Sequence, residues 1–143
     1  MKNFALAFTL LFFISAYSQS TNPNKNLNFN ITSLNEDPII DGNSLDEDLW
    51  NSLLPLTDLK QIKPNYGASA SENTEIRIAY TSKTLYVAVV CYDSAPNEIV
   101  VSDSRRDADL NDDDSFLFII DTYNDQQNGF LFGTNADGME YDA

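Results

Sequence analysis

The chain has 143 residues, the length of one domain, and it carries 22 acidic and 8 basic residues for a formal net charge of -14. Nucleic acid repels a polyanion of this kind, so neutral molecules and cations are the partners to expect. Histidine is absent from the sequence, which removes the usual ligand of a zinc centre and the usual base of a nucleophilic triad. Hydrophobic residues make up 43% of the chain, enough to build a core, so we expect the acidity on a folded surface.

The first residues have the pattern of an export signal. Lys2 supplies the positive start, and residues 4–14 form an apolar run too short to span a bilayer. Ala16 and Ser18 are the small residues that precede a cleavage site before Gln19. We expect a signal peptide over 1–18, with an uncleaved anchor as the alternative. Export would place the protein in the periplasm, in the outer membrane or at the cell surface.

A polar stretch and one short helix follow. Residues 19–30 are rich in Asn, Ser and Gln, and we place a linker over 19–35. Ser44 and Glu47 have the spacing of a capping box, and Pro55 would end the helix. Its apolar face would carry Leu45, Leu49 and Leu53. Because Trp50 lies beside that face, we expect its side chain in the core, with a sugar-stacking surface as the alternative.

The rest of the chain alternates apolar and polar residues with a period of two, which predicts strands. The first two are expected over 75–80 and 85–92, as antiparallel neighbours joined by the polar link 81–84. Further strands are expected over 116–121, 129–134 and 139–142. This pattern predicts an all-β fold, an antiparallel β-sandwich of jelly-roll type over 36–143 that is incomplete at its C-terminal end, as in a fragment of a longer protein.

Both faces of the stretch 85–91 are apolar, which predicts a central strand covered on both sides. Cys91 ends this stretch and is the single cysteine of the chain, so an internal disulfide is excluded. Its place in an apolar run predicts a buried thiol.

Three segments, in this order, resemble a known family. PIIDGNSLDEDLW over 38–50, ENTEIRIAYTSKTLYVAVVCYDSAP over 72–96 and DDDSFLFIIDTYNDQQNGFLFGTNADGMEYDA over 112–143 resemble the carbohydrate-binding module family 9-like domain. In large exported surface proteins of Bacteroidetes-type bacteria, such a domain precedes a long β-rich region. The resemblance implies a sugar held between aromatic side chains, structural calcium, and a C-terminal region of the same parent protein as a partner.

Loop residues are the candidates for a sugar site. Tyr66, Tyr92 and Tyr123 lie in or beside loops, where a ring with a polar tip can meet a ligand, although tyrosine is also common at sheet edges. Arg105 and Arg106 can donate forked hydrogen bonds to sugar hydroxyls. Arg77 could donate in the same way, but it lies within a strand and is expected to pair across the sheet with the neighbours of Glu75.

Acidic residues are dense beside the two loop arginines. Asp107, Asp109, Asp112 and Asp113 are the candidates for a Ca²⁺ site, because this cation takes several oxygen ligands. A solvated loop neutralised by Arg105 and Arg106 is the alternative. A second cluster, Asp121, Asn124 and Asp125, predicts an Asx-type turn.

The sequence predicts binding and not catalysis. Glycoside hydrolysis needs two matched carboxylates, and no pair is singled out among the 22 acidic residues. We expect a carbohydrate-binding module for a polysaccharide or oligosaccharide that serves polysaccharide catabolism, in a parent protein linked to hydrolysis of O-glycosyl compounds. A structural or interaction module of an outer-membrane-associated protein, without a sugar ligand, is the alternative.

Overall fold

A computed structural model describes residues 29–143, and the folded unit runs from Ile31 to Ala143. The expected signal peptide and residues 19–28 of the expected linker lie outside the described residues. In the described part no helix is long and apolar enough to cross a membrane. The fold is mostly β, with two three-stranded sheets and few helical residues.

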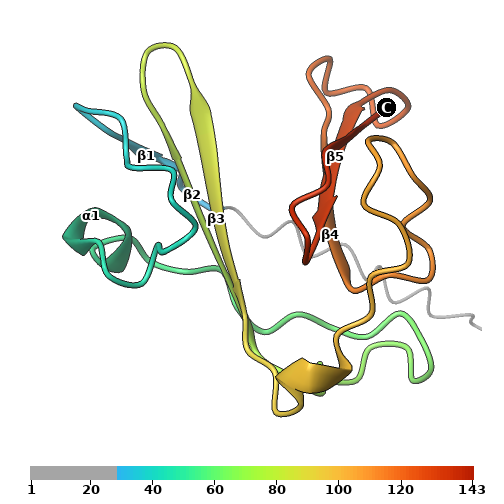
Figure 1. The fold of residues 1–143 in the computed structure, drawn as a ribbon. Helices are drawn as coiled ribbons and strands as arrows, with labels where there is room; N and C mark the ends of the chain where they lie inside the picture. The colour runs from blue at the N-terminus through green and yellow to red at the C-terminus, as the bar shows by residue number, and fades with distance from the viewer. Residues whose placement is uncertain (1–28) are drawn as a thin grey trace, which may run out of the picture. The chain divides into compact units, whose positions relative to one another are not determined.

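The first sheet has the order β1-β2-β3 (Figure 1). Its strands are β1 (Thr32–Ser33), β2 (Thr74–Tyr80) and β3 (Leu85–Cys91). The expected antiparallel pair is confirmed, since Thr74 lies opposite Cys91 and Tyr80 opposite Leu85. β1, however, pairs with β2 in parallel, so this sheet is mixed and not purely antiparallel. Residues 31–35 of the expected linker therefore belong to the folded unit.

The second sheet has the order β4-β5-β6 and is antiparallel. Its strands are β4 (Ser115–Ile120), β5 (Phe130–Asn135) and β6 (Tyr141–Asp142). Each matches a sequence-predicted strand, and β6 is shorter than expected. The turn before β6 closes with a hydrogen bond from the Gly138 amide to the Asn135 carbonyl, 3.0 Å. Gly138 has φ +78°, a conformation that glycine adopts without strain.

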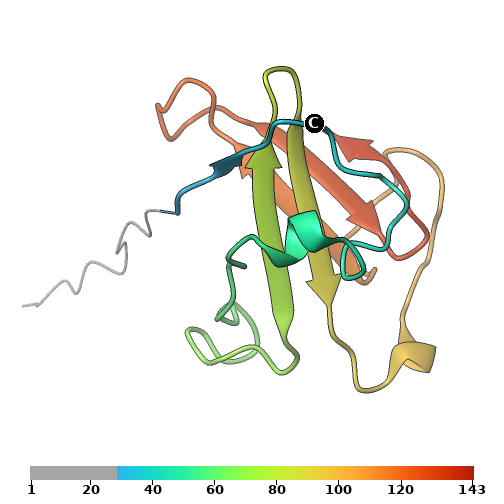
Figure 2. The same cartoon turned by 90° about the vertical axis from the view of Figure 1, so that its left-hand side faces the viewer.

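One face of the first sheet is covered by the helical segment. Trp50 and Leu53 pack against Ala79 of β2, with Tyr86 and Ala88 of β3 at the edge of the cluster. Trp50 is 3% exposed, so its interpretation as a core residue is confirmed. Figures 1 and 2 show the helix α1 on the side of β2 and β3 that faces away from β4 and β5.

The helix itself differs from the prediction. α1 (Asp48–Asn51) is a single turn, its N-cap is Glu47 instead of Ser44, and no side chain caps it. A helix nucleus is costly, and a segment this short gains stability from burying Trp50 and not from its own hydrogen bonds. Among residues 29–143, the other helical element is the three-residue 3₁₀ turn η1 (Pro96–Glu98).

Two expectations for β3 are wrong. β3 is an edge strand in the described residues, because β2 is its one strand neighbour. It is apolar on both faces since one face meets the Trp50 cluster and the other faces the second sheet. Cys91 is exposed, not buried. It ends the strand on the face that looks toward the second sheet, and the space between the two sheets is open there.

The outer face of the second sheet is covered by the loop that precedes β4. Leu110 from this loop and Met139 from the β5–β6 turn are buried, at 7% and 4% exposure. A Cβ placed on Gly133 would lie 3.2 Å from Leu110 Cδ1 and 3.1 Å from Leu117 Cγ. The absence of a side chain at Gly133 therefore lets the loop approach the strand.

Candidate functional site

The inner faces of the two sheets border a cleft of about 740 Å³, which we call the inter-sheet cleft. Its walls carry Val87, Val89 and Cys91 of β3, and Phe116, Phe118 and Phe132 of β4 and β5. Alternation places each set on one face, because every second residue of a strand points the same way. Phe118 lies opposite Phe132 in register, and their ring centroids are 5.5 Å apart. The second sheet thus presents an aromatic wall to the inter-sheet cleft.

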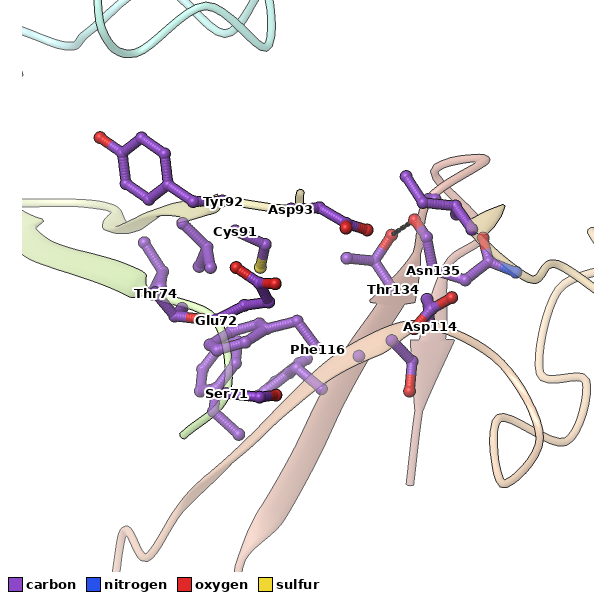
Figure 3. Close-up of a pocket in the computed structure, with 18 residues that line it drawn as sticks. Ser71, Glu72, Thr74, Cys91, Tyr92, Asp93, Asp114, Phe116, Thr134 and Asn135 are labelled. Atoms are coloured by element: carbon purple, nitrogen blue, oxygen red, sulfur yellow. Dashed lines mark hydrogen bonds between the residues drawn. The ribbon is translucent and has the colours of Figure 1, made fainter. Parts of the chain in front are cut away.

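Three carboxylates line the inter-sheet cleft: Glu72 before β2, Asp93 after β3 and Asp114 before β4 (Figure 3). The Asp93 carboxylate points toward Thr134 on the opposite wall. No lysine or arginine is among the described lining residues. The charged side chains that line the inter-sheet cleft are therefore all acidic.

Each of these carboxylates accepts one hydrogen bond that fixes its orientation. Glu72 Oε1 accepts from Ser94 Oγ at 2.7 Å, and Asp93 Oδ1 accepts from the Ala95 amide at 2.7 Å. Asp114 Oδ2 accepts from the Val100 amide, also at 2.7 Å. Within residues 29–143, the second oxygen of each carboxylate has no such donor. The inter-sheet cleft therefore holds three oriented hydrogen-bond acceptors.

One of the three sequence-predicted tyrosines belongs to this site. Tyr92 follows β3 and lines the inter-sheet cleft. Tyr66 and Tyr123 lie on other loops and are 79% and 75% exposed. The structure therefore does not bring the three rings together, and a sugar site built from all of them would need separate contacts.

The two sequence-predicted arginines pair with acids outside the inter-sheet cleft. Arg105 Nε lies 3.0 Å from both carboxylate oxygens of Asp103, and this contact raises the pKa of the guanidinium. The same contact lowers the pKa of Asp103 to about 2. Arg106 pairs with Asp142 and lies 3.3 Å from Glu140 Oε2, which ties the loop before β4 to β6. Both side chains stay solvent-exposed, so they remain open to a ligand of their own.

The four sequence-predicted calcium ligands do not converge. Among the described residues, no group of three or more His, Cys, Asp or Glu side chains is placed to hold a metal ion. Asp113 accepts from the Ser102 amide at 2.8 Å and from Asn135 Nδ2 at 3.0 Å, and these donors lower its pKa. Asp107 Oδ1 accepts from the Asp142 amide, and Asp109 Oδ1 from the Asn111 amide. For Asp112, the fourth candidate, the structure gives no contact that favours a metal.

One smaller prediction is confirmed and another is wrong. Asp121 accepts hydrogen bonds from the amides of Tyr123 and Gln126, at 3.2 and 2.8 Å, as an Asx-type turn requires. These backbone donors, Gln126 first, lower the pKa of Asp121. Arg77, which was expected to pair across the sheet, instead pairs with Glu75 on its own strand, with 2.9 Å between Nη2 and Oε2.

Most residues of the inter-sheet cleft were missed from the sequence. Phe116, Phe118 and Phe132 were assigned to strands, where alternation gives them a common face but not the neighbour of that face. Glu72, Asp93 and Asp114 each lie beside the end of a strand. Nothing in the sequence distinguishes these three from the other residues among its 22 acids. The signal that could have found them is their position at strand ends beside aromatic strands, which becomes specific once the sheets are paired.

Comparison of the chain with protein-family models, with curated proteins and with solved structures gave no match. The resemblance to the family 9-like carbohydrate-binding domain therefore stays a prediction.

Proposed function

We propose that this protein binds carbohydrate in the inter-sheet cleft. The observation that carries the proposal is the combination of an aromatic wall with three oriented carboxylates in one space of about 740 Å³. Cavities of this size accommodate small ligands, and their few polar groups set the ligand's orientation. Phenyl rings fit the C–H faces of a pyranose, and carboxylate oxygens accept hydrogen bonds from its hydroxyls.

Tyr92 is the one sequence-predicted ligand residue that lines this cleft. On this proposal the two sheets are the halves of a β-sandwich, as the resemblance to the carbohydrate-binding family implies. The proposal is binding alone. Hydrolysis of O-glycosyl compounds would then belong to other parts of a longer exported parent protein.

The test is retention on insoluble polysaccharides and on a glycan array, followed by two cleft variants, Tyr92→Ala and Phe118→Leu. We expect each variant to lose about tenfold in affinity, because each removes an aromatic face. Tyr66→Ala and Tyr123→Ala, in exposed loops outside the cleft, are the matched controls and should bind as the parent does. A folded protein that retains no polysaccharide would contradict the proposal.

Calcium is proposed on the sequence alone, with Asp107, Asp109, Asp112 and Asp113 as ligands. If the ion is structural, thermal unfolding should shift to higher temperature with Ca²⁺ and back with a chelator, since a ligand of the native state stabilises it. Equal unfolding temperatures under both conditions would remove calcium from the proposal.

A second function is favoured by one observation, the open edge of β3 beside the inter-sheet cleft. An edge strand can pair with an added strand from another chain segment, which would then cover the aromatic wall. On this reading the protein is an interaction module, and the expected C-terminal region of a longer parent is its occupant. Adding that region as a separate polypeptide should then protect the β3 amides from hydrogen exchange, whereas a sugar-binding module should show no such protection.

A further inference from the structure

The charged groups that line the inter-sheet cleft are all negative. Glu72, Asp93 and Asp114 line it, and no basic residue among the described lining residues offsets them. They come from three separate segments, so the charge is a property of the assembled site and not of one acidic run. We infer that the cleft selects glycans that carry free amino groups, such as glucosamine oligomers, over neutral glycans and against uronic acids; this rests on the proposed function.

The geometry favours an ammonium group over a hydroxyl. Each carboxylate is held by one donor at 2.7 Å and keeps its second oxygen for a ligand. An ammonium group offers three donors and a positive charge, and charge-assisted hydrogen bonds are stronger than neutral ones. The aromatic wall of Phe116, Phe118 and Phe132 takes the C–H face of the same sugar ring.

A bare metal ion explains the three carboxylates less well. A divalent cation needs several oxygens within one coordination sphere. Glu72, Asp93 and Asp114 do not form a group that could hold a metal within the described residues. Carboxylates spread along an aromatic cleft suit an extended ligand that carries several positive charges.

Cys91 gives a direct readout of occupancy. It lines the inter-sheet cleft, is exposed, and is the single cysteine of the chain. A ligand in the cleft should slow alkylation of its thiol by a maleimide, whereas a cation bound elsewhere on the acidic surface should not. The assay therefore separates cleft binding from general attraction to a chain of net charge -14.

The experiment compares three oligomers of equal length by calorimetry and by protection of Cys91: a glucosamine oligomer, its N-acetylated form and an oligogalacturonate. We expect the glucosamine oligomer to bind about tenfold more tightly than the N-acetylated form, and the oligogalacturonate to bind more weakly than both. Added salt should reduce the difference, since it screens charge. Spermine is the control for cations that lack a sugar ring and should protect Cys91 less than the glucosamine oligomer.

Asp93→Asn and Glu72→Gln should remove the preference for the amine while keeping the affinity for the N-acetylated oligomer. Glu36→Gln, an exposed acid outside the cleft, is the matched control and should leave the preference unchanged. Equal binding of the glucosamine and N-acetylated oligomers overturns this inference and leaves the proposed function standing. Binding of none of the three, with Cys91 unprotected, contradicts the proposed function itself.

Discussion

The side chain of Asn135 joins the second sheet to its covering loop. Its Nδ2 donates to the Asp103 carbonyl and to Asp113 Oδ2, both at 3.0 Å. Its Oδ1 accepts from the amides of Asp137 and Met139 at 3.1 and 3.2 Å. The residue is 6% exposed, so water cannot easily replace these partners.

Replacing Asn135 by alanine should lower the free energy of unfolding by about 1–3 kcal/mol, because buried donors and acceptors lose their partner. Urea unfolding followed by circular dichroism measures this loss. Asn128→Ala is the control, since that amide bonds only Asp125 at an exposed site and should cost far less. Equal stability of the two variants would show that Asn135 does not hold the loop.

At the scale of elements, the contact between β5 and the loop before β4 is set by a glycine. Gly133 leaves room for Leu110 and Leu117, which lie 3.2 and 3.1 Å from the position of a Cβ. The loop in turn carries the carboxylates that link it to β5 and β6. The close approach of Leu110 to Gly133 therefore helps to hold the whole loop before β4 against the second sheet.

A Gly133→Val variant should be destabilised by roughly 1–3 kcal/mol, because the added methyl groups overpack a filled contact. Combining it with Leu110→Ala tests the cause, since the shortened side chain gives space to the valine. The double variant should then cost less than the sum of the two single variants, as contacting residues do not add. Strict additivity in the unfolding free energies would place the strain elsewhere.

The elements that alternation defines could be predicted from the sequence. β2, β3, β4 and β5 start and end within two residues of expectation, and the link 81–84 joins its strands as an antiparallel pair. Alternation is a local property, so it does not say what lies opposite a face. For that reason the exposed Cys91 and the aromatic wall of the inter-sheet cleft appear only when the sheets are assembled.

Two errors have a different cause. The four-residue α1 lost its expected cap because a capping pattern gives a weak bias that packing of Trp50 outweighs. The parallel pairing of β1 depends on residues far along the chain, and its two residues carry no strand pattern of their own. Site residues at strand ends were missed for the same reason, since their neighbours are distant in sequence.

At the scale of the whole molecule, much of the acidity is used to fix loops. Donors within the folded chain lower the pKa of four aspartates, Asp103, Asp113, Asp121 and Asp125. A carboxyl whose pKa is lower when folded stabilises the fold above its unfolded pKa, and this contribution is lost as the pH falls through the folded value. For Asp103 that window runs from 3.8 down to about 2.

The midpoint of thermal unfolding should therefore stay level from pH 7 to about pH 5 and fall below pH 4. Moderate salt is needed in the measurement, because protonation also relieves repulsion within a chain of net charge -14. Arg105→Gln should flatten part of the fall, since Arg105 is the main cause of the low pKa of Asp103. A midpoint that rises on acidification in salt would show that repulsion dominates over the loop hydrogen bonds.

The connectivity of the strands has a consequence for the order of folding. The short link 81–84 joins β2 to β3, and β4 pairs with β5, the strand that follows it in the chain. Each of these two pairs therefore closes a short loop. The hydrogen bond from Tyr86 Oη to Asp37 Oδ1, 2.7 Å, instead joins residues 49 apart in sequence. Closing a longer loop costs more chain entropy, and contacts of this kind tend to form late. Tyr86→Phe should then speed unfolding and leave the refolding rate nearly unchanged, which places the N-terminal segment after the hairpins on the folding pathway.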